Sequence, residues 1–300
     1  KKIKKFNKTI KIPGDKSCSI RALLLASQCI GESKIFNLLE STDVLDCLKA
    51  LRTLGVKIVK RKNHYSVYGN GLNSFKIKRK LTRLYCGNSL TTGRLLTGLL
   101  STIPSKFYIY GDASANRRDF MRVIEPLEKV GAQFFPRKKT LPLTIEGTSL
   151  PLAQKHVETR GSSQVKGLIL LSALSTPGIT TVEELKSKSS RTHTEIFLKK
   201  IGCDIKFKQT KKSNLIYLRG QKNLYSFNYS VKNDPSSAAY LICLSLLTPG
   251  SKLTLPRVIC NDTRIEFIKV LRKMNGRIKI KDLKIDSSSG ELVGTIIAYG

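Results

Sequence analysis

The sequence predicts an α/β protein assembled from four copies of one β/α unit. Four segments repeat the same layout, each with an apolar stretch at helical spacing and a short run of β-branched or aromatic residues typical of a strand. The copies begin at Gly14, Cys86, Gly161 and Asn233, roughly 70 to 75 residues apart, which is longer than the repeats of solenoid proteins.

Each copy opens with small polar residues, continues into an apolar helix, turns at Gly or Pro, and makes a short strand. A second amphipathic helix and another strand follow. In the first copy, apolar spacing predicts helices over 21–28 and 44–54, and Ser41 or Thr42 would cap the second. Two such helices packed on a small sheet would bury the apolar faces of each copy. Strands are predicted at 34–38, 107–110, 179–182 and 253–255, and polar hairpins between copies at 60–80 and 209–225.

Composition indicates a globular protein with room for two domains, since the chain has 300 residues of which 40% are apolar. The apolar runs 168–174 and 240–247 are shorter than the ~20 residues of a membrane helix, so no membrane partner is expected. Seven cysteines without a CxxC pair predict reduced, buried thiols and a cytoplasmic location. Three widely separated histidines give no metal-ligand spacing, so no metal site is expected.

The formal net charge of +33 raises the question of a polyanionic partner. The basic residues are spread along the whole chain, and there is neither a tryptophan nor a zinc-finger spacing. We therefore expect no specific nucleic-acid partner. Any non-specific binding to nucleic acid should weaken steeply as the salt concentration rises. A basic nucleic-acid-binding protein remains an alternative.

The polar openings of the copies predict anion binding, because a helix start presents free backbone N–H groups and a favourable dipole. Repetition suggests a ligand with several anionic groups, although an ordinary N-cap beside a solvated base would explain any single copy. No P-loop and no G-x-G-x-x-G motif is present, which argues against kinases and dinucleotide enzymes. Four cations lie near the first helices of the first three copies: Lys16, Arg21, Arg94 and Lys166. Arg117 and Arg118 are at the expected start of the second helix of copy two, and Arg191 lies just ahead of the second helix of copy three.

A more specific signal comes from a series of motifs. They are PGDKSCSIRALLLA from Pro13, CGNSLTTGRLL from Cys86, GDASANRRDFMRVIEPLEKVGA from Gly111, SSQVKGLILLSAL from Ser162, SRTHTE from Ser190, DPSSAAY from Asp234 and TRIEFIKVLRKMNG from Thr263. In this order, over about residues 11–276, they resemble the motifs of the 5-enolpyruvylshikimate-3-phosphate synthase family. Each motif alone is of moderate specificity, and together they are highly specific.

The resemblance implies the enolpyruvate transferase fold, an inside-out α/β barrel-like arrangement of two domains with three units each. Residues 14–228 would form a complete domain of three units, and 1–13 plus 229–300 a partial second domain with one. The chain would then be C-terminally incomplete, without the family's catalytic aspartate and glutamate and its later arginine and lysine ligands. Apolar helix residues with few packing partners would be Ile265, Ile268, Val270 and Leu271.

The resemblance also implies an activity: transfer of the enolpyruvyl group of phosphoenolpyruvate to the 5-hydroxyl of shikimate 3-phosphate, with release of phosphate, in aromatic amino-acid biosynthesis. No cofactor is implied, and the full-length protein is expected to be a monomer. Lys16 would contact both substrates and assist proton transfer. Residues implied for shikimate 3-phosphate are Ser17, Arg21, Ser162, Ser163, Gln164 and Arg191. Those implied for phosphoenolpyruvate are Asn88, Thr91, Arg94, Arg118 and Gln164.

Two departures from the family motifs bear on this activity. Leu90 stands where the family has a small residue in the phosphoenolpyruvate pocket, which predicts weak phosphoenolpyruvate affinity and resistance to the analogue glyphosate. Asp119 replaces a proline beside Arg118 and could pair with Arg117. A decayed, non-catalytic remnant is one alternative. Another is UDP-N-acetylglucosamine enolpyruvyl transferase, which would carry a reactive loop cysteine and a different N-terminal signature.

Overall fold

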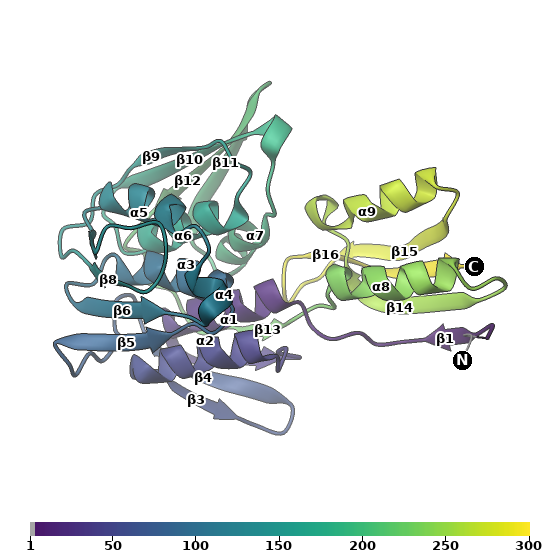
Figure 1. The fold of residues 1–300 in the computed structure, drawn as a ribbon, viewed down its shortest axis with the longest axis horizontal. Helices are drawn as coiled ribbons and strands as arrows, with labels where there is room; N and C mark the ends of the chain where they lie inside the picture. The colour runs from purple at the N-terminus through teal and green to yellow at the C-terminus, as the bar shows by residue number, and fades with distance from the viewer. Residues whose placement is uncertain (1–3) are drawn as a thin grey trace.

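A computed structural model describes residues 4–300, which form two lobes of unequal size (Figure 1). The larger lobe contains helices α1 to α7, and the smaller lobe contains α8, α9 and both ends of the described chain. The first three residues of the segment 1–13, expected in the partial domain, lie outside this description. Within residues 4–300, no helix has the length and apolar character needed to cross a bilayer.

Four separate four-stranded sheets of identical topology contain the strands of residues 4–300, and no closed barrel is formed. In every sheet the first and second strands pair in parallel, and the third strand pairs antiparallel with both the second and the fourth. The predicted fold class, α/β with repeated β/α units, is therefore confirmed.

The larger lobe contains three of these sheets. The first is β13 (Asn228–Ser230), β2 (Ile30–Phe36), β4 (His64–Asn70) and β3 (Lys57–Lys60). The second is β5 (Leu81–Tyr85), β6 (Lys106–Tyr110), β8 (Leu143–Glu146) and β7 (Gln133–Phe135), and the third is β9 (Lys155–Glu158), β10 (Ile179–Leu185), β12 (Ser213–Arg219) and β11 (Asp204–Gln209).

Two helices or more accompany each of these sheets, as the sequence predicted. The first helix of each unit is α1 (Lys16–Ser27), α3 (Leu90–Leu100) or α6 (Ser163–Ala173). The later helices are α2 (Thr42–Thr53), the short α4 (Ala113–Asn116) with α5 (Met121–Glu128), and α7 (His193–Lys200).

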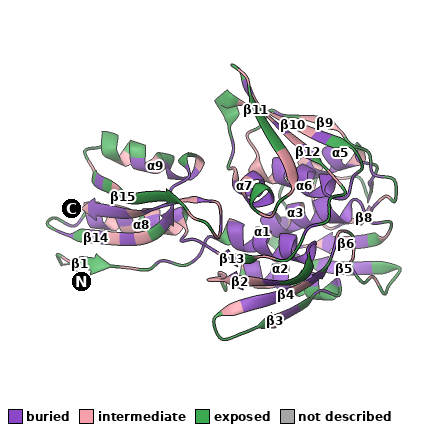
Figure 2. Ribbon diagram, turned by 180° about the vertical axis from the view of Figure 1, so that it is seen from behind, coloured by how far each residue is buried: buried purple, intermediate pink, exposed green. Residues whose placement is uncertain are grey.

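The three first helices form the centre of the larger lobe, and nearly all their residues are buried (Figure 2). A helix that is apolar on all sides is typical of such a central position. Gly98 lets α3 approach α6, because a Cβ there would lie 2.4 Å from the carbonyl oxygen of Leu168. All seven cysteines are free thiols and five are buried, as predicted.

The hairpins predicted at 60–80 and 209–225 are confirmed in part: β3 pairs antiparallel with β4, and β11 with β12, but these strands belong to the sheets of the units and are not separate connections between copies. Strand β4 lies between β2 and β3, β12 lies between β10 and β11, and residues 71–80 form no strand. Polar residues on one face obscured this assignment, since the opposite face is buried through residues such as Val67 and Leu218.

The smaller lobe has one sheet and its own core. Its elements are β1 (Asn7–Thr9), β14 (Lys252–Ile259), β16 (Leu292–Tyr299), β15 (Arg277–Ile285), α8 (Pro235–Leu246) and α9 (Asp262–Lys273). The prediction that apolar residues of α9 have few packing partners is wrong for Ile265 and Ile268, which are 9% and 1% exposed. It holds for Val270, at 57%, and Tyr240 and Leu247 are about 80% exposed nearby.

The chain crosses between the lobes just before α1 and again after β13. Bridges join Gly14 to Asn233 and Asn233 to Val258, so the crossovers lie side by side. The carboxylate of Asp286, in the smaller lobe, lies 2.9 Å from the Lys232 ammonium of the second crossover. Partial burial would raise the pKa of Asp286, but the Ser288 hydroxyl and the Lys232 ammonium hold it below its ordinary value of 3.8.

We expect Asp286→Asn to reduce the free energy of unfolding at neutral pH and to flatten its decline between about pH 5 and pH 3. The pKa of Asp286 is lower in the folded state, so its stabilising contribution is complete above the unfolded-state pKa and is lost as the pH falls through the folded-state pKa. The free energy of unfolding is measured by urea denaturation monitored by circular dichroism. The control is Asp204→Asn, at an ion pair whose carboxylate is 38% exposed, against 20% for Asp286. An identical pH dependence in the Asp286 variant and the unsubstituted chain would contradict it.

Candidate functional site

The start of α1 places Lys16 at the surface of the larger lobe. Asp15 caps this helix by accepting a hydrogen bond from the Cys18 amide, 2.8 Å long. Lys16, the first helical residue, has a side chain that is 48% exposed. Its ammonium lies 2.7 Å from the carboxylate of Asp43, at the start of α2. The first two helices of the chain thus direct one cation, with its counter-ion, outward.

Lys16 borders a cavity of about 320 Å³ between the starts of α1, α2, α3 and α6 and the segment joining α4 to α5. All the residues predicted for phosphoenolpyruvate line this cavity. Its lining is Lys16, Asp43, Asn88, Ser89, Leu90, Thr91, Arg94, Arg118 and Gln164. The first helices of three consecutive units therefore begin at one place, as their equivalent positions in the repeat require.

Hydrogen bonds fix the polar side chains around this cavity. Gln164 accepts a hydrogen bond from Arg94 and donates one of 3.0 Å to the Thr91 hydroxyl. Arg118 donates a hydrogen bond of 2.8 Å to the side-chain oxygen of Asn88. Such contacts hold both guanidinium groups in place before any ligand binds.

The cavity concentrates positive charge. It is lined by Lys16, Arg94 and Arg118 but by only one carboxylate, that of Asp43. Burial, and then the neighbouring Arg122 charge, lower the pKa of Arg94 to about 10, which still leaves the group charged at neutral pH. The arrangement suits a small ligand with more than one anionic group.

The segment around Arg118 differs from the prediction. Arg117 and Arg118 do not open the second helix of this unit, because they follow the short α4 and precede α5. The Asp119 carboxylate accepts a hydrogen bond from the Met121 amide at the start of α5, and the Asp119 carbonyl oxygen accepts one from Arg94. Asp119 therefore supports this segment through local hydrogen bonds, and Arg118 is held by Asn88 and Ser114.

The residues predicted only for shikimate 3-phosphate lie outside the lining of this cavity. Arg21 is 2% exposed and donates to the hydroxyls of Ser17 and Thr194, at 2.8 Å each. Ser162 caps α6 through the Val165 amide. Arg191 is exposed just before α7, as predicted. Ser163, the first residue of α6, is partly buried beside Gln164, which connects this group to the cavity.

Lys166 is not available as an anion ligand, contrary to the prediction from its position near a helix start. Its side chain is fully buried, and its ammonium lies 3.1 Å from Glu184 and 2.7 Å from Glu195. It occupies the first turn of α6 on the side facing β10 and α7, so its charge is neutralised inside the lobe.

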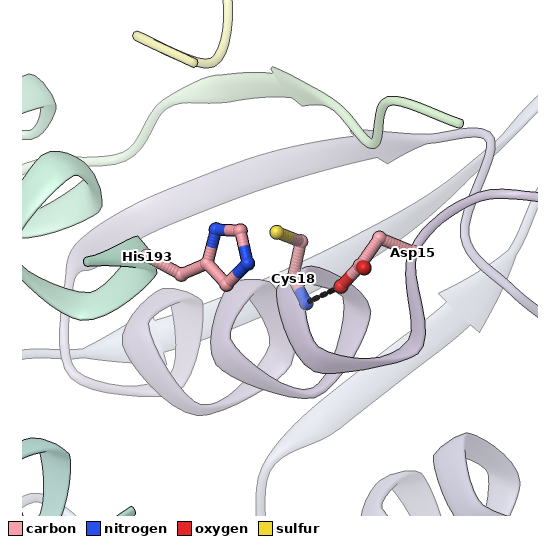
Figure 3. A group of neighbouring side chains, drawn as sticks. All are labelled: Asp15, Cys18 and His193. Atoms are coloured by element: carbon pink, nitrogen blue, oxygen red, sulfur yellow. Dashed lines mark hydrogen bonds between the residues drawn. The ribbon is translucent and has the colours of Figure 1, made fainter. Parts of the chain in front are cut away.

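A buried cluster beside the start of α1 was not predicted from the sequence. Asp15, Cys18 and His193 present ligand atoms within 4.8 Å of one another, as a metal site would (Figure 3). The Arg264 guanidinium already lies there, 2.6 Å from Asp15 and 2.7 Å from Nε2 of His193. The cation of this cluster is therefore an arginine of the smaller lobe. Asp43, the counter-ion of Lys16 on the cavity wall, was not predicted from the sequence either.

Comparisons with known proteins show the family of the chain. The family model described as EPSP synthase (3-phosphoshikimate 1-carboxyvinyltransferase) matches residues 1–295. The chain is 37% identical over 292 residues to 3-phosphoshikimate 1-carboxyvinyltransferase of Ruegeria sp. (strain TM1040), covering 96% of the chain. The protein of that name from Nitrobacter winogradskyi is 37% identical over 286 residues, covering 93% of the chain.

A solved structure, EPSP synthase from Acinetobacter baumannii, superposes on the whole chain with a TM-score of 0.86 and 32% identity. The chain covers 66% of that structure and 63% of the length of each of the two curated relatives. It therefore spans slightly less than two thirds of the proteins it resembles.

Proposed function

This chain belongs to the EPSP synthase family, and on that premise we propose that it carries the larger part of an enolpyruvyl transferase active site. The reaction joins phosphoenolpyruvate to the 5-hydroxyl of shikimate 3-phosphate. The single observation that carries the proposal is the cationic cavity at the shared start of α1, α3 and α6.

The cavity supplies the contacts that phosphoenolpyruvate requires. Arg118, Arg94 and Lys16 would neutralise its phosphate and carboxylate, with Asn88, Thr91 and Gln164 providing hydrogen bonds. The 5-hydroxyl oxygen attacks C2 and gives up its proton while C3 takes a proton. The tetrahedral intermediate then expels phosphate and loses a proton from C3, which restores the double bond in the enolpyruvyl ether. Lys16 is the group placed to exchange a proton or to stabilise the developing charge, because its ammonium is exposed at the cavity edge.

Shikimate 3-phosphate would bind beside this cavity, at the starts of α1, α6 and α7. We propose Ser162 and Ser163 for its phosphate, since the start of α6 offers free backbone N–H groups. Lys16, Ser17, Arg21, Gln164 and Arg191 complete the proposed set. Gln164 would touch both substrates, because it lies between Arg94 and Thr91 on the cavity wall.

We propose the predicted division into a complete domain of three units, 14–228, and one unit of a second domain, with the boundary moved past Ser230 because β13 pairs with β2. The exposed apolar side chains of Tyr240, Leu247 and Val270 support this division, because they would pack against further units. The substrate site would then lie between the domains, with acid–base residues of the second domain facing Lys16.

Phosphate release from phosphoenolpyruvate in the presence of shikimate 3-phosphate tests this function. It should be measured with this chain and with a form extended by the coding sequence that follows residue 300. We expect turnover in the extended form only when both substrates are present. A folded extended form without turnover would overturn the proposal and favour a non-catalytic remnant.

We expect Leu90→Ala to tighten the binding of phosphoenolpyruvate and glyphosate about tenfold, the scale of effect that small changes in pocket volume produce. Leu90 is 3% exposed, packs in the core and lines the cavity, so shortening it enlarges the space beside Thr91 and Arg94. The glyphosate inhibition constant of the extended form measures the effect.

Leu95→Ala is the matched control, because Leu95 is buried in the same helix but does not line the cavity. Both variants should lose stability from a core void, and only Leu90→Ala should change ligand affinity. Equal glyphosate inhibition of all three proteins, or strong inhibition of the unsubstituted protein, would refute the role of Leu90.

A further inference from the structure

Arg264 reaches from the smaller lobe into the larger lobe and is almost completely enclosed, its side chain 2% exposed. It lies in the first turn of α9, where the dihedral angles depart from helical values at Ile265. One guanidinium nitrogen contacts Asp15 and His193, and the other lies 2.8 Å from Asp234 and 3.1 Å from the Ser236 hydroxyl. A single side chain thus joins four segments of the chain.

Two of these contacts fall on helix starts that carry proposed ligands. Asp15 caps α1 and directly precedes Lys16 and Ser17. His193 is the first residue of α7 and follows Arg191 by two positions. Because Asp15 and His193 are both about 1% exposed, neither can move without disturbing the helix start that it belongs to.

The hydrogen-bond pattern gives His193 a defined orientation. A guanidinium has only donors, so Nε2 of His193 must accept from Arg264, and the ring hydrogen lies on Nδ1. Nδ1 is 2.6 Å from the carboxylate of Glu291, a second buried residue of the smaller lobe. The smaller lobe therefore holds the ring from both sides, and the side-chain amide of Asn261 also donates to Thr192, 2.8 Å away.

We infer that Arg264 is a positioning residue that sets Lys16 and Arg191 in register with the smaller lobe. This inference rests on the proposed function, which assigns Lys16 and Arg191 to substrate binding. The guanidinium holds the cap of α1 through Asp15 and the start of α7 through His193, so the proposed substrate ligands keep a fixed place relative to the lobe that faces them. Four directed contacts explain why an arginine, and not a lysine, fits this position.

The test compares Arg264→Ala and Arg264→Lys with Arg272→Lys, a control two turns later on α9 whose side chain bonds only the Ile278 carbonyl oxygen. Hydrogen exchange of backbone amides is measured first, because it needs no substrate. We expect faster exchange at the starts of α1 and α7 in both Arg264 variants, with the start of α3 unchanged. Added guanidinium ion should restore protection in Arg264→Ala, and ammonium at equal ionic strength should not.

The affinity for shikimate 3-phosphate is measured next, with a loss of about tenfold to a hundredfold expected in both Arg264 variants and none in Arg272→Lys. A nuclear magnetic resonance signal of the His193 ring hydrogen should shift in both Arg264 variants.

Arg264→Lys guards against a variant that fails to fold, since it keeps the charge. Unchanged exchange at α1 and α7 in a folded Arg264 variant overturns the inference. Failure of the unsubstituted chain to bind shikimate 3-phosphate counts against the proposed function, while the exchange data still decide the positioning role.

Discussion

Lys16→Met is expected to reduce turnover of the extended form by about a hundredfold to a thousandfold, the scale seen when one preorganised charge-stabilising donor is removed. The ammonium is the only exposed lysine group on the cavity, and it is placed by the Asp15 cap and the Asp43 carboxylate. Methionine keeps the length of the side chain and its apolar stem but cannot stabilise an anion or exchange a proton. Steady-state kinetics with each substrate varied in turn would measure the loss.

Lys49→Met is the matched control for this experiment. Lys49 lies on α2, is 72% exposed and pairs with Asp46 at 3.3 Å, but it does not line the cavity. Both ammonium groups are exposed, but the Asp46 carboxylate is only 5% exposed, so Lys49→Met should cost at least as much stability as Lys16→Met and any difference in activity is not due to unfolding of the Lys16 variant. Equal activity of the two variants would show that Lys16 has no part in the reaction.

The convergence of Lys16, Thr91 and Gln164 could be predicted because it follows from the repeat. Equivalent residues of successive units occupy equivalent positions, so three helix starts meet wherever three units pack together. The family motifs then identified which side chains face the ligand. Arg264 could not be found in this way, since its contact with Asp15 joins positions 249 residues apart in sequence.

The direction in which a helical side chain points depends on packing that a sequence pattern does not show. Lys166 follows Ser162 by four residues, so a helix start with a nearby cation looked like an anion site. Whether that cation faces the ligand or the core depends on how α6 packs against β10 and α7, where Glu184 and Glu195 lie. The place of β12 was mistaken for a related reason: its polar residues suggested a hairpin between copies, but the strand is internal to a sheet and buries Ile216 and Leu218.

This correction leads to the largest expected effect on stability, that of Lys166→Met. The ammonium is fully buried between two carboxylates that are about 3% exposed, so its removal leaves uncompensated charge inside the lobe. Breaking a buried ion pair from one side costs about 3–5 kcal/mol. We expect the free energy of unfolding to fall by that amount. Because the chain has no tryptophan, circular dichroism in urea is the suitable measurement.

Lys106→Met provides the comparison, since Lys106 pairs with Glu146 at 3.4 Å on the surface and should contribute at most ~1 kcal/mol. A triple variant, Lys166→Met with Glu184→Gln and Glu195→Gln, removes the whole charge group. It should recover part of the stability lost in Lys166→Met, because no unpaired charge remains buried. If the triple variant were less stable than Lys166→Met, the loss would stem from packing and hydrogen bonds around Lys166, and the buried charge would not be its cause.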